Sequence, residues 1–588
     1  MGGIVCQFRA DRGTGEARMM NSGVAIRYGD VAPEAKENFI PSASEKASFV
    51  DLSQLQRYNL NFPNYANPCE LYSVVLDGGA SAFPSAPENA NLGLWSEQIS
   101  GDDGAFASPI VLTLTSAGQY SSQGFTFTFD TYNDIYPTHI NIHWWRDTAE
   151  AMEDLDAMDF YPDNAFYFCR NKVENYNRVV ITFTALNTPY NRLKLRVIDY
   201  GYGTFFYGNE LRNVRLVQEM NPISSEISIN TTDFTLDSKT DMEYSFQAKQ
   251  PLSIYFNGKL KATTFVKKST RKAKRLWDIQ SEDYIGLMDS IPYYGGMYFG
   301  KDAYDLLADI FTVAKVPYSI NEGLKGFLLY GYIPFTTCRD ALMQVAFAVQ
   351  NVVDTSNNSE TVNVTELKDD VTQTIELNRI MQGQSFTNDE TVTAVEIACH
   401  TYKAITETVE VYNASESGTG ANILVKFSEP LHDLSISNGS FALDKEGNEE
   451  KHTNYAIINA NAGCVLTGQK YEHTTVTQRE NNPVVLASEI EKIVTIENAT
   501  LVSSQNIDMV LEKCYNWLIK TKTTNLKIVE GKHVAYEGDN AIVTYDKPVS
   551  LGEVIKSKTE YLGEVEGRIV KQSFSLNGGI IVKEAVLK

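Results

Sequence analysis

The chain has 588 residues, of which 43% are hydrophobic, 21% charged and 11% aromatic. This composition is typical of globular proteins and excludes disordered, collagen-like and coiled-coil classes. At roughly 100–200 residues per domain, the length predicts about three to five domains. Lysine and arginine number 51 against 74 aspartates and glutamates, which gives a net charge of −23. Tight nucleic-acid binding is therefore not expected, although a negative channel wall would let DNA slide past without sticking.

The sequence also argues against membrane-spanning and disulfide-rich classes. It has no run of 18 or more apolar residues, so we expect no spanning helix and no stable membrane insertion. The first 20 residues lack the apolar core of a secretory signal. The seven cysteines are scattered and form no Cys-x-x-Cys pair. This predicts reduced, mostly buried thiols rather than a disulfide framework or a zinc ribbon.

The N-terminal third divides into two parts. Residues 1–45 are rich in small and charged residues without a sustained period, which predicts a poorly structured N-terminal extension. From 46 to 205 the signal is β, because short apolar–polar alternations are separated by turn residues. The clearest of these segments are 125–129, 140–145, 179–183 and 192–197. Together they predict a β-sandwich. The acidic stretch 150–159 interrupts the pattern, and it suits either a short helix or a solvated loop.

Helices enter the pattern after residue 206. Apolar side chains recur at helical spacing over 302–316, 334–350 and 506–520. Each of these stretches is predicted to be a helix with one buried face. Because β segments lie between them, the remainder of the chain is predicted to be α+β with intercalated domains.

No catalytic constellation is visible. The metalloprotease, α/β-hydrolase and P-loop motifs are absent from the sequence. His139 and His143 would share one face of a strand, but a metal site needs a third ligand, so a hydrogen-bonded pair is expected. Cys399 and His400 are adjacent and would point to opposite faces of a strand, which excludes a nucleophile–base pair. We therefore predict a non-enzymatic protein with no catalytic residue, no metal and no cofactor.

Two adjacent tryptophans in the segment 140–145 are expected to face opposite sides of a strand. Trp144 alternates with the apolar positions and is expected to be buried, whereas Trp145 points outward. Exposed aromatic rings on a sandwich can stack on the apolar faces of sugars. Trp145, with His143, is the candidate carbohydrate-binding site. The simpler alternative is packing in a core or an interface.

A basic run is the sharpest local charge in the sequence. Residues 251–300 include 8 basic and 4 acidic residues, whereas 351–450 includes 18 acidic and 5 basic ones. The candidate contact residues are Lys267, Lys268, Arg271, Lys272, Lys274 and Arg275. They suit a contact with an acidic protein surface, such as 351–450 of a second copy, or with nucleic acid. The alternative is a solvated hairpin whose lysines protect an edge strand.

Several segments of the chain carry a family resemblance. Those in the sandwich region are PENANLGLWS (87–96), SQGFTFTFD (122–130), YNRVVITF (176–183) and PYNRLKLRVIDYG (189–201). They resemble the galactose-binding-like, discoidin-type sandwich in tail proteins of phages and prophages of Gram-positive bacteria. Further segments resemble the tail hub of such phages, namely 250–255, 279–289, 295–298, 339–345, 537–543 and 567–573. That hub is related in fold to the baseplate hub of myophages.

The resemblance implies a fold, which is a galactose-binding-like jelly-roll sandwich followed by α+β tail-hub domains containing β-barrels. On this basis 1–45 is an N-terminal extension and 46–205 is the sandwich. The region 206–370 is then a hub region with the first barrel and an α/β insertion. The region 371–588 is a hub region with an acidic β domain, the second barrel and the helix 506–520. Two barrels in each of three subunits would match a hexameric tail tube.

The resemblance also implies a function. Such a hub is a ring, usually a homotrimer, that caps the host-facing end of the tail tube, and tape measure protein and then DNA pass through it. The expected partners are distal tail and tail-tube proteins, the tape measure protein, and a tail fibre or receptor-binding protein. The expected location is the virion, at the tail tip or baseplate, after assembly in the host cytoplasm. The alternative is an adsorption protein whose sandwich binds a host cell-wall glycan.

Overall fold

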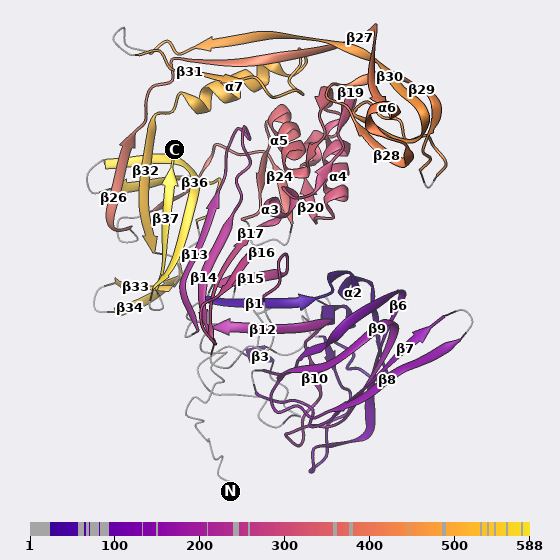
Figure 1. Cartoon of the computed structure of the whole chain (residues 1–588). Coiled ribbons are helices and arrows are strands. Elements are labelled where there is room, and N and C mark those ends of the chain that lie inside the picture. The colour runs from indigo at the N-terminus through magenta and orange to yellow at the C-terminus, as the bar shows by residue number, and fades with distance from the viewer. Residues whose placement is uncertain are drawn as a thin grey trace.

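The computed structural model of the chain is rich in β-sheet (Figure 1). It describes residues 24–56, 64–65, 70, 81–82, 93–131, 133–148, 151–207, 210–238, 246–256, 259–356, 361–375, 380–444, 446–484, 490–529, 532–537, 540–545, 549–559, 563–577 and 580–588. Several sheets with separate apolar cores confirm the predicted β-rich multidomain class.

The N-terminal domain, which we call the sandwich, is a six-stranded sheet with a short ribbon packed against its core. The sheet order is β11 (Val197–Asp199), β6 (Ala105–Thr128), β9 (Phe166–Ala185), β7 (Ile140–Asp147) and β8 (Met152–Phe160), with β2 (Ile40–Ala43) paired to β6. The ribbon pairs β5 (Leu94–Trp95) with β10 (Lys194–Leu195). Phe125, Ile181 and Leu195 share one core, because every second strand residue faces inward. Short elements complete the region: α2 (Pro33–Asn38), η1 (Leu52–Gln56), β3 (Asn64–Tyr65) and β4 (Ser81–Ala82).

A 13-stranded sheet forms the centre of the molecule. Its first part, the first β unit, comprises in order β12 (Gly201–Tyr207), β1 (Val24–Val31), β15 (Pro251–Phe256), β16 (Lys259–Arg271), β17 (Leu276–Glu282), β14 (Thr231–Asp237) and β13 (Leu211–Glu219). Its second part, the second β unit, comprises β36 (Gly563–Asn577), β37 (Ile580–Leu587), β32 (Lys522–Val529), β26 (Ile380–Asn388), β35 (Val554–Thr559) and β25 (Val371–Ile375). A separate hairpin pairs β33 (Lys532–Glu537) with β34 (Asn540–Tyr545).

Each β unit has its own core, and the two units share one sheet. Ile26, Leu216 and Trp277 are buried in the first core, and Leu526 and Ile555 in the second. The units meet where β13 pairs with β36. Among the described strands, the path ends at β12 and β26 without closing, which corrects the expectation of barrels. To close the first unit, β13 would have to pair with β12, but β13 pairs with β36 of the second unit instead.

The region between the two units contains three helices and short strands. The helices are α3 (Tyr284–Met288), α4 (Ala303–Ala314) and α5 (Cys338–Val349). The strands are β18 (Pro292–Tyr293) with β22 (Thr336–Thr337), β19 (Gly296–Asp302) with β21 (Leu328–Ile333), and β20 (Tyr318–Ile320) with β24 (Val362–Thr365) and β23 (Val352–Asp354), and a single turn η3 spans Glu322–Leu324. Asp302 and Thr337 cap α4 and α5 with their side chains. Both helices lie where the sequence predicts them.

A long two-stranded ribbon, β27 (Ala394–Asn413) with β30 (Tyr455–Asn481), runs across one end of the molecule (Figure 1). We call residues 394–481 the arm, its part 413–465 the arm tip, and its paired segments 394–402 and 473–481 the arm root. The tip adds α6 (Ala414–Ser417), β28 (Gly420–Lys426) and β29 (Leu431–Phe441), which pack on a small core of their own. At the other end of the ribbon lie β31 (Ile493–Ile496) and α7 (Ile507–Leu518). The helix α7 confirms the third helix prediction.

Two sequence expectations are wrong. Residues 1–23 of the predicted extension 1–45 lie outside the described residues, but its part 24–45 is structured, because β1 lies inside the large sheet between β12 and β15 and β2 pairs with β6. Its strand partners are distant in sequence, so no local pattern reveals them. The acidic stretch 150–159 is neither a helix nor a loop, because most of it is the strand β8. As an edge strand it exposes both faces, which removes the apolar alternation and suits charged residues.

Candidate functional surfaces

The seam between the two β units is fixed by polar side chains. Gln218 and Gln572 stand opposite each other in the paired strands, and the Gln572 amide donates to Gln218 Oε1 at 2.8 Å. Both side chains are buried. Next to them Lys571 and Glu219 form an ion pair. A buried amide pair tolerates little misalignment, so the seam holds the two units in one register.

The candidate sugar-binding residues lie on the outer face of the sandwich. Trp144 is fully buried, as predicted, and Trp145 is half-buried on the opposite face. The His143 and Trp145 rings stack with centroids 4.1 Å apart. His143 Nε2 lies 2.7 Å from Asp154 Oδ1 on β8. The structure therefore brings both predicted residues together.

A second imidazole–aromatic pair repeats this arrangement along the same two strands. His139 Nε2 lies 2.8 Å from Asp159 Oδ1, and the His139 ring contacts that of Tyr161 at 5.3 Å. Tyr161 is 68% exposed. The two histidines are each hydrogen-bonded to an aspartate and partly buried, as expected for a hydrogen-bonded pair rather than a metal site. Tyr161 and the aspartates were missed because the stretch 150–159 was not interpreted as a strand.

The basic run lies on the hairpin β16–β17 and is partly neutralised there. Lys267 Nζ lies 2.6 Å from Glu282 Oε2, and Lys272 pairs with Asp278. Arg271 lies over the Trp277 ring at 5.1 Å. The strand β16 pairs with β15 over 259–265 and with β17 over 265–271. Among the described strands, the part that carries Lys267, Lys268 and Arg271 therefore pairs on one side, as the edge-strand alternative expects. The remaining candidates are Lys268 beside Gln280 in β17, and Lys274 and Arg275 at the turn.

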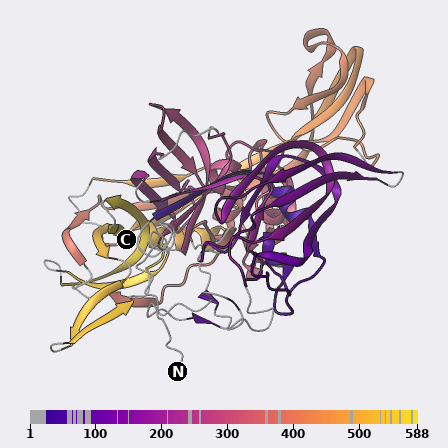
Figure 2. The same cartoon turned by 90° about the horizontal axis from the view of Figure 1, so that it is seen from below.

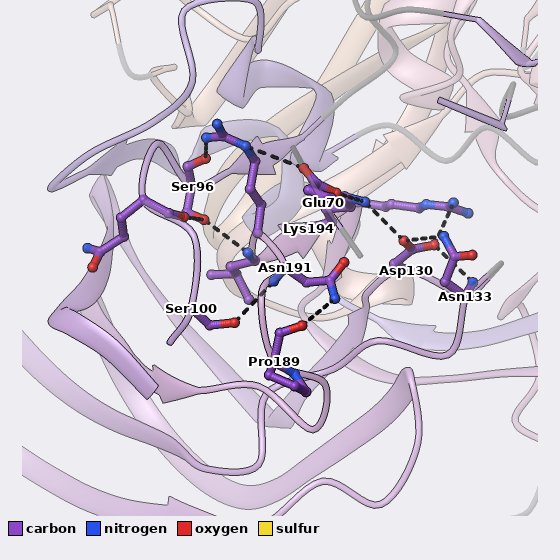
Figure 3. Close-up of polar contacts among 12 residues, drawn as sticks. Glu70, Ser96, Ser100, Asp130, Asn133, Pro189, Asn191 and Lys194 are labelled. Atoms are coloured by element: carbon purple, nitrogen blue, oxygen red, sulfur yellow. Dashed lines mark hydrogen bonds and ion pairs between the residues drawn. The ribbon is translucent and has the colours of Figure 1, made fainter. Parts of the chain in front are cut away.

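A network of buried charges lies beneath the ribbon β5–β10 of the sandwich (Figure 3). Lys194 Nζ lies 2.5 Å from Glu70 Oε2 and 3.4 Å from Asp130 Oδ2. Arg192 approaches Glu70 and Arg196 approaches Asp130. Burial alone would raise the pKa of Asp130, but the charges of Lys194 and Arg196 outweigh burial and hold that pKa below its usual value. The network holds residue 70 against the sandwich.

A third buried carboxylate joins the sandwich to the large sheet. Asp199 on β11 is fully buried and pairs with Arg27 on β1 and with Lys36 of α2, the latter at 3.2 Å. Burial opposes its ionised form, but Arg27 and Lys36 lower its pKa below the usual value. Both cations beside Asp199 are paired with it. The charged cluster therefore has a structural role, which is to join the sandwich to the large sheet.

The structure also bears on the predictions about cysteines, metal sites and membrane-spanning helices. Cys169, Cys338, Cys399, Cys464 and Cys514 are free and buried, as expected. Cys6 and Cys69 lie outside the described residues. Within the described ranges, no group of three or more histidine, cysteine or acidic side chains is placed to hold a metal ion. No helix in those ranges has both the length and the apolarity needed to cross a bilayer.

Comparison with known proteins gives loose structural likenesses. No family model matches the chain, and no curated protein matches it. A tail protein from Neisseria meningitidis MC58 is 10% identical, with 64% of this chain and 91% of that chain covered at a TM-score of 0.38. The 43 kDa tail protein of prophage MuSo2 from Shewanella oneidensis is 8% identical, with 66% and 94% covered at 0.39.

A prophage tail protein from Listeria monocytogenes EGD-e is 12% identical, with 65% of this chain and 90% of that chain covered at a TM-score of 0.34. These three matched structures are tail proteins. At TM-scores below 0.5 the likenesses carry no argument about this chain, so its function is argued from its own sequence and geometry.

Proposed function

We propose that the chain is a structural component of the tail hub of a phage or phage-like particle. The observation that carries this proposal is the pair of β units in one sheet, each with its own core and both locked at the β13–β36 seam. The sequence resemblance to tail hubs supports the same function independently. In this function the β units build a ring, and the sandwich decorates it.

The ring would be a homotrimer at the host-facing end of the tail tube. Three chains with two β units each present six units around one axis, which suits a sixfold tube. Its neighbours would be distal tail and tail-tube proteins, the tape measure protein, and a tail fibre or receptor-binding protein. The net charge of −23 suits a lumen through which DNA passes without sticking. The proposal assigns no catalysis.

The test is the mass of the assembled chain and its place in a particle. We expect light scattering across a range of concentrations to give a species of three times 65.7 kDa. Electron microscopy with purified tail tubes should then show that ring at one end of the tube. A chain that forms no ring alone and never joins a tail tube would contradict the proposal.

A second function, binding of a host cell-wall glycan, is favoured by one observation. The outer face of β7 and β8 presents two imidazole–aromatic pairs, each held by an aspartate at 2.7–2.8 Å. Aromatic rings beside carboxylates suit the apolar faces and hydroxyls of a sugar. We expect Trp145→Ala to weaken binding to purified cell-wall polysaccharide by about tenfold. Tyr190→Ala, in the exposed loop before β10, is the control, and equal binding by both variants would contradict this function.

A further inference from the structure

A cavity of about 420 Å³ lies between the end of α7 and the second β unit. Four cationic side chains line it: Lys520, Lys522, Arg568 and Lys588. Two acidic side chains, Asp369 and Glu566, also line it. The sequence did not reveal this group, because its members are spread from Asp369 to Lys588 and its cations become neighbours only through strand pairing.

The two acidic groups of the cavity are already engaged. Arg568, whose side chain is 5% exposed, pairs with Asp369 and donates to the Gly552 carbonyl. Glu566 Oε2 lies 3.1 Å from Lys556 Nζ. The three lysines therefore remain without a carboxylate at ion-pair distance within the described part of the chain.

The lysines are also held close together by an aromatic ring. Lys520 Nζ and Lys588 Nζ lie 5.2 Å and 5.5 Å from the Trp517 ring centroid. The ring attracts both ammonium groups but supplies no negative charge to compensate them. Like charges in a half-enclosed site repel, and an anionic partner relieves that repulsion. In a chain with a net charge of −23, a positive cavity of this kind is a local exception.

The arm tip has the opposite charge. Residues 413–465 contain seven acidic and three basic residues. Glu416, Glu429 and Glu446 are exposed, and the described residues place no cation at ion-pair distance from them. Figure 1 shows the arm tip, with α6 and β28, at one end of the molecule and the C-terminal strands at the other, and Figure 2 shows the same separation. The two surfaces cannot meet within one chain.

We propose that the acidic arm tip of one copy docks in the basic cavity of the next copy around the ring. A head-to-tail interface joins two different surfaces of the same chain, and repeating it closes a ring. The arm supplies the reach, since β27 alone has 20 residues and a strand rises about 3.3 Å per residue. The inference rests on the proposed ring and names the contact that closes it.

The experiment uses the full chain with reversed charges. Lys520→Glu/Lys522→Glu is expected to weaken self-association by about tenfold or more, because two attractive pairs become repulsive. Mixing this variant with Glu416→Lys/Glu446→Lys is expected to restore pairs of unlike chains, measured by sedimentation of differently labelled chains. Lys301→Glu/Lys315→Glu, on exposed lysines near α4, makes the same change in net charge and should leave association unchanged. All substituted side chains are exposed, and circular dichroism verifies folding.

The outcomes separate this inference from the proposed function. A ring that forms equally well with Lys520→Glu/Lys522→Glu overturns the inference and leaves the hub function standing. A loss of association that the mixed variants do not restore also overturns it, because the cavity would then bind something other than the arm tip. A native chain that stays monomeric at every concentration overturns the inference as well, and incorporation into tail particles then decides the hub function by itself.

Discussion

The sandwich and the arm are both made of long antiparallel strands, yet they use their side chains in opposite ways. The sandwich directs every second residue of β6 and β9 into one large core and buries three carboxylates with their cations. The arm has a small core at its tip and shares another with α7 at its root, and much of the ribbon between them is exposed on both faces. Strand length therefore does not measure stability. The sandwich is stabilised from within, and the arm depends on what holds its root and tip.

The largest effect is expected in the sandwich core. Trp144 is fully buried and stacks on Phe125 with ring centroids 6.1 Å apart. Trp144→Ala should destabilise the sandwich by about 3–5 kcal/mol, because it leaves a large cavity. Hydrogen exchange of β6 and β9 peptides across a urea series measures this. Trp145→Ala on the outer face is the control and should cost about 1 kcal/mol or less. Equal losses would contradict the inside–outside assignment of the two rings.

A smaller loss of stability is expected when the ion pairs between the sandwich and the large sheet are broken. Asp199→Asn removes the buried carboxylate charge that pairs with Arg27 and Lys36 and should cost about 3 kcal/mol. Asp154→Asn, whose carboxylate pairs with His143 and is 58% exposed, is the matched control and should cost less than about 1 kcal/mol. Chemical denaturation with hydrogen exchange at β1 and β11 compares the two. A similar response of both variants would contradict the coupling.

The pH dependence of the Asp199 contribution has a definite sign. Its folded-state pKa lies below its usual value, so the unfolded chain takes up a proton first as the pH falls. The stabilisation is therefore present above about pH 4 and is lost as the pH falls further. The difference between the native chain and Asp199→Asn should shrink in acid.

The same comparison shows what could be predicted from the sequence. The spacing of apolar residues along the sequence identifies α4, α5 and α7, and strand alternation identifies the opposite orientations of Trp144 and Trp145. Both patterns depend only on neighbours within a few residues. Edge strands lack that period, so β8 was not recognised. The position of β1 and the cavity beside α7 depend on pairings between residues far apart in the chain, which no local pattern contains. The basic run is local, and the structure shows that its lysines are partly paired there.

An intermediate effect is expected where β21 meets the segment between β31 and α7. Gly331 on β21 has a φ of +138°, and a Cβ there would lie 2.2 Å from the Thr500 carbonyl oxygen. Tyr332 donates its backbone N–H to the same carbonyl at 3.3 Å. Gly331→Ala must push the two segments apart, at a cost of about 2 kcal/mol. Gly326→Ala, with φ +85° and nothing within 4 Å, should cost about 1 kcal/mol. Exchange of residues 498–505 distinguishes these variants, and equal protection would contradict the contact.

The smallest effect is expected from two histidines at the arm root. His400 Nδ1 lies 2.9 Å from His473 Nε2, and the two rings are stacked 5.2 Å apart. The ring of Tyr402 stacks on His473 from the other side at 4.5 Å. Burial lowers the pKa of His400, and the neighbouring His473 lowers it further. The pair shares one hydrogen, so charging both rings would place two cations in contact.

The stability of the arm root should fall as the pH falls. A histidine paired with an acidic group would have the opposite effect, because it stabilises the fold more at low pH. Above the ordinary histidine pKa of about 6.5, His400 is neutral in both the folded and the unfolded chain, so it does not make the stability of the arm depend on pH. Below it the unfolded root binds the proton more readily, so the protection of β27 should fall between pH 7.5 and pH 5.5. His400→Gln should abolish that part of the change, while amides of the sandwich core, which lies away from the pair, should not respond. A native arm that keeps its protection at pH 5.5, or an unchanged response in His400→Gln, would contradict the assignment. Because the arm has no large core to compensate, even this modest loss should be visible in its exchange.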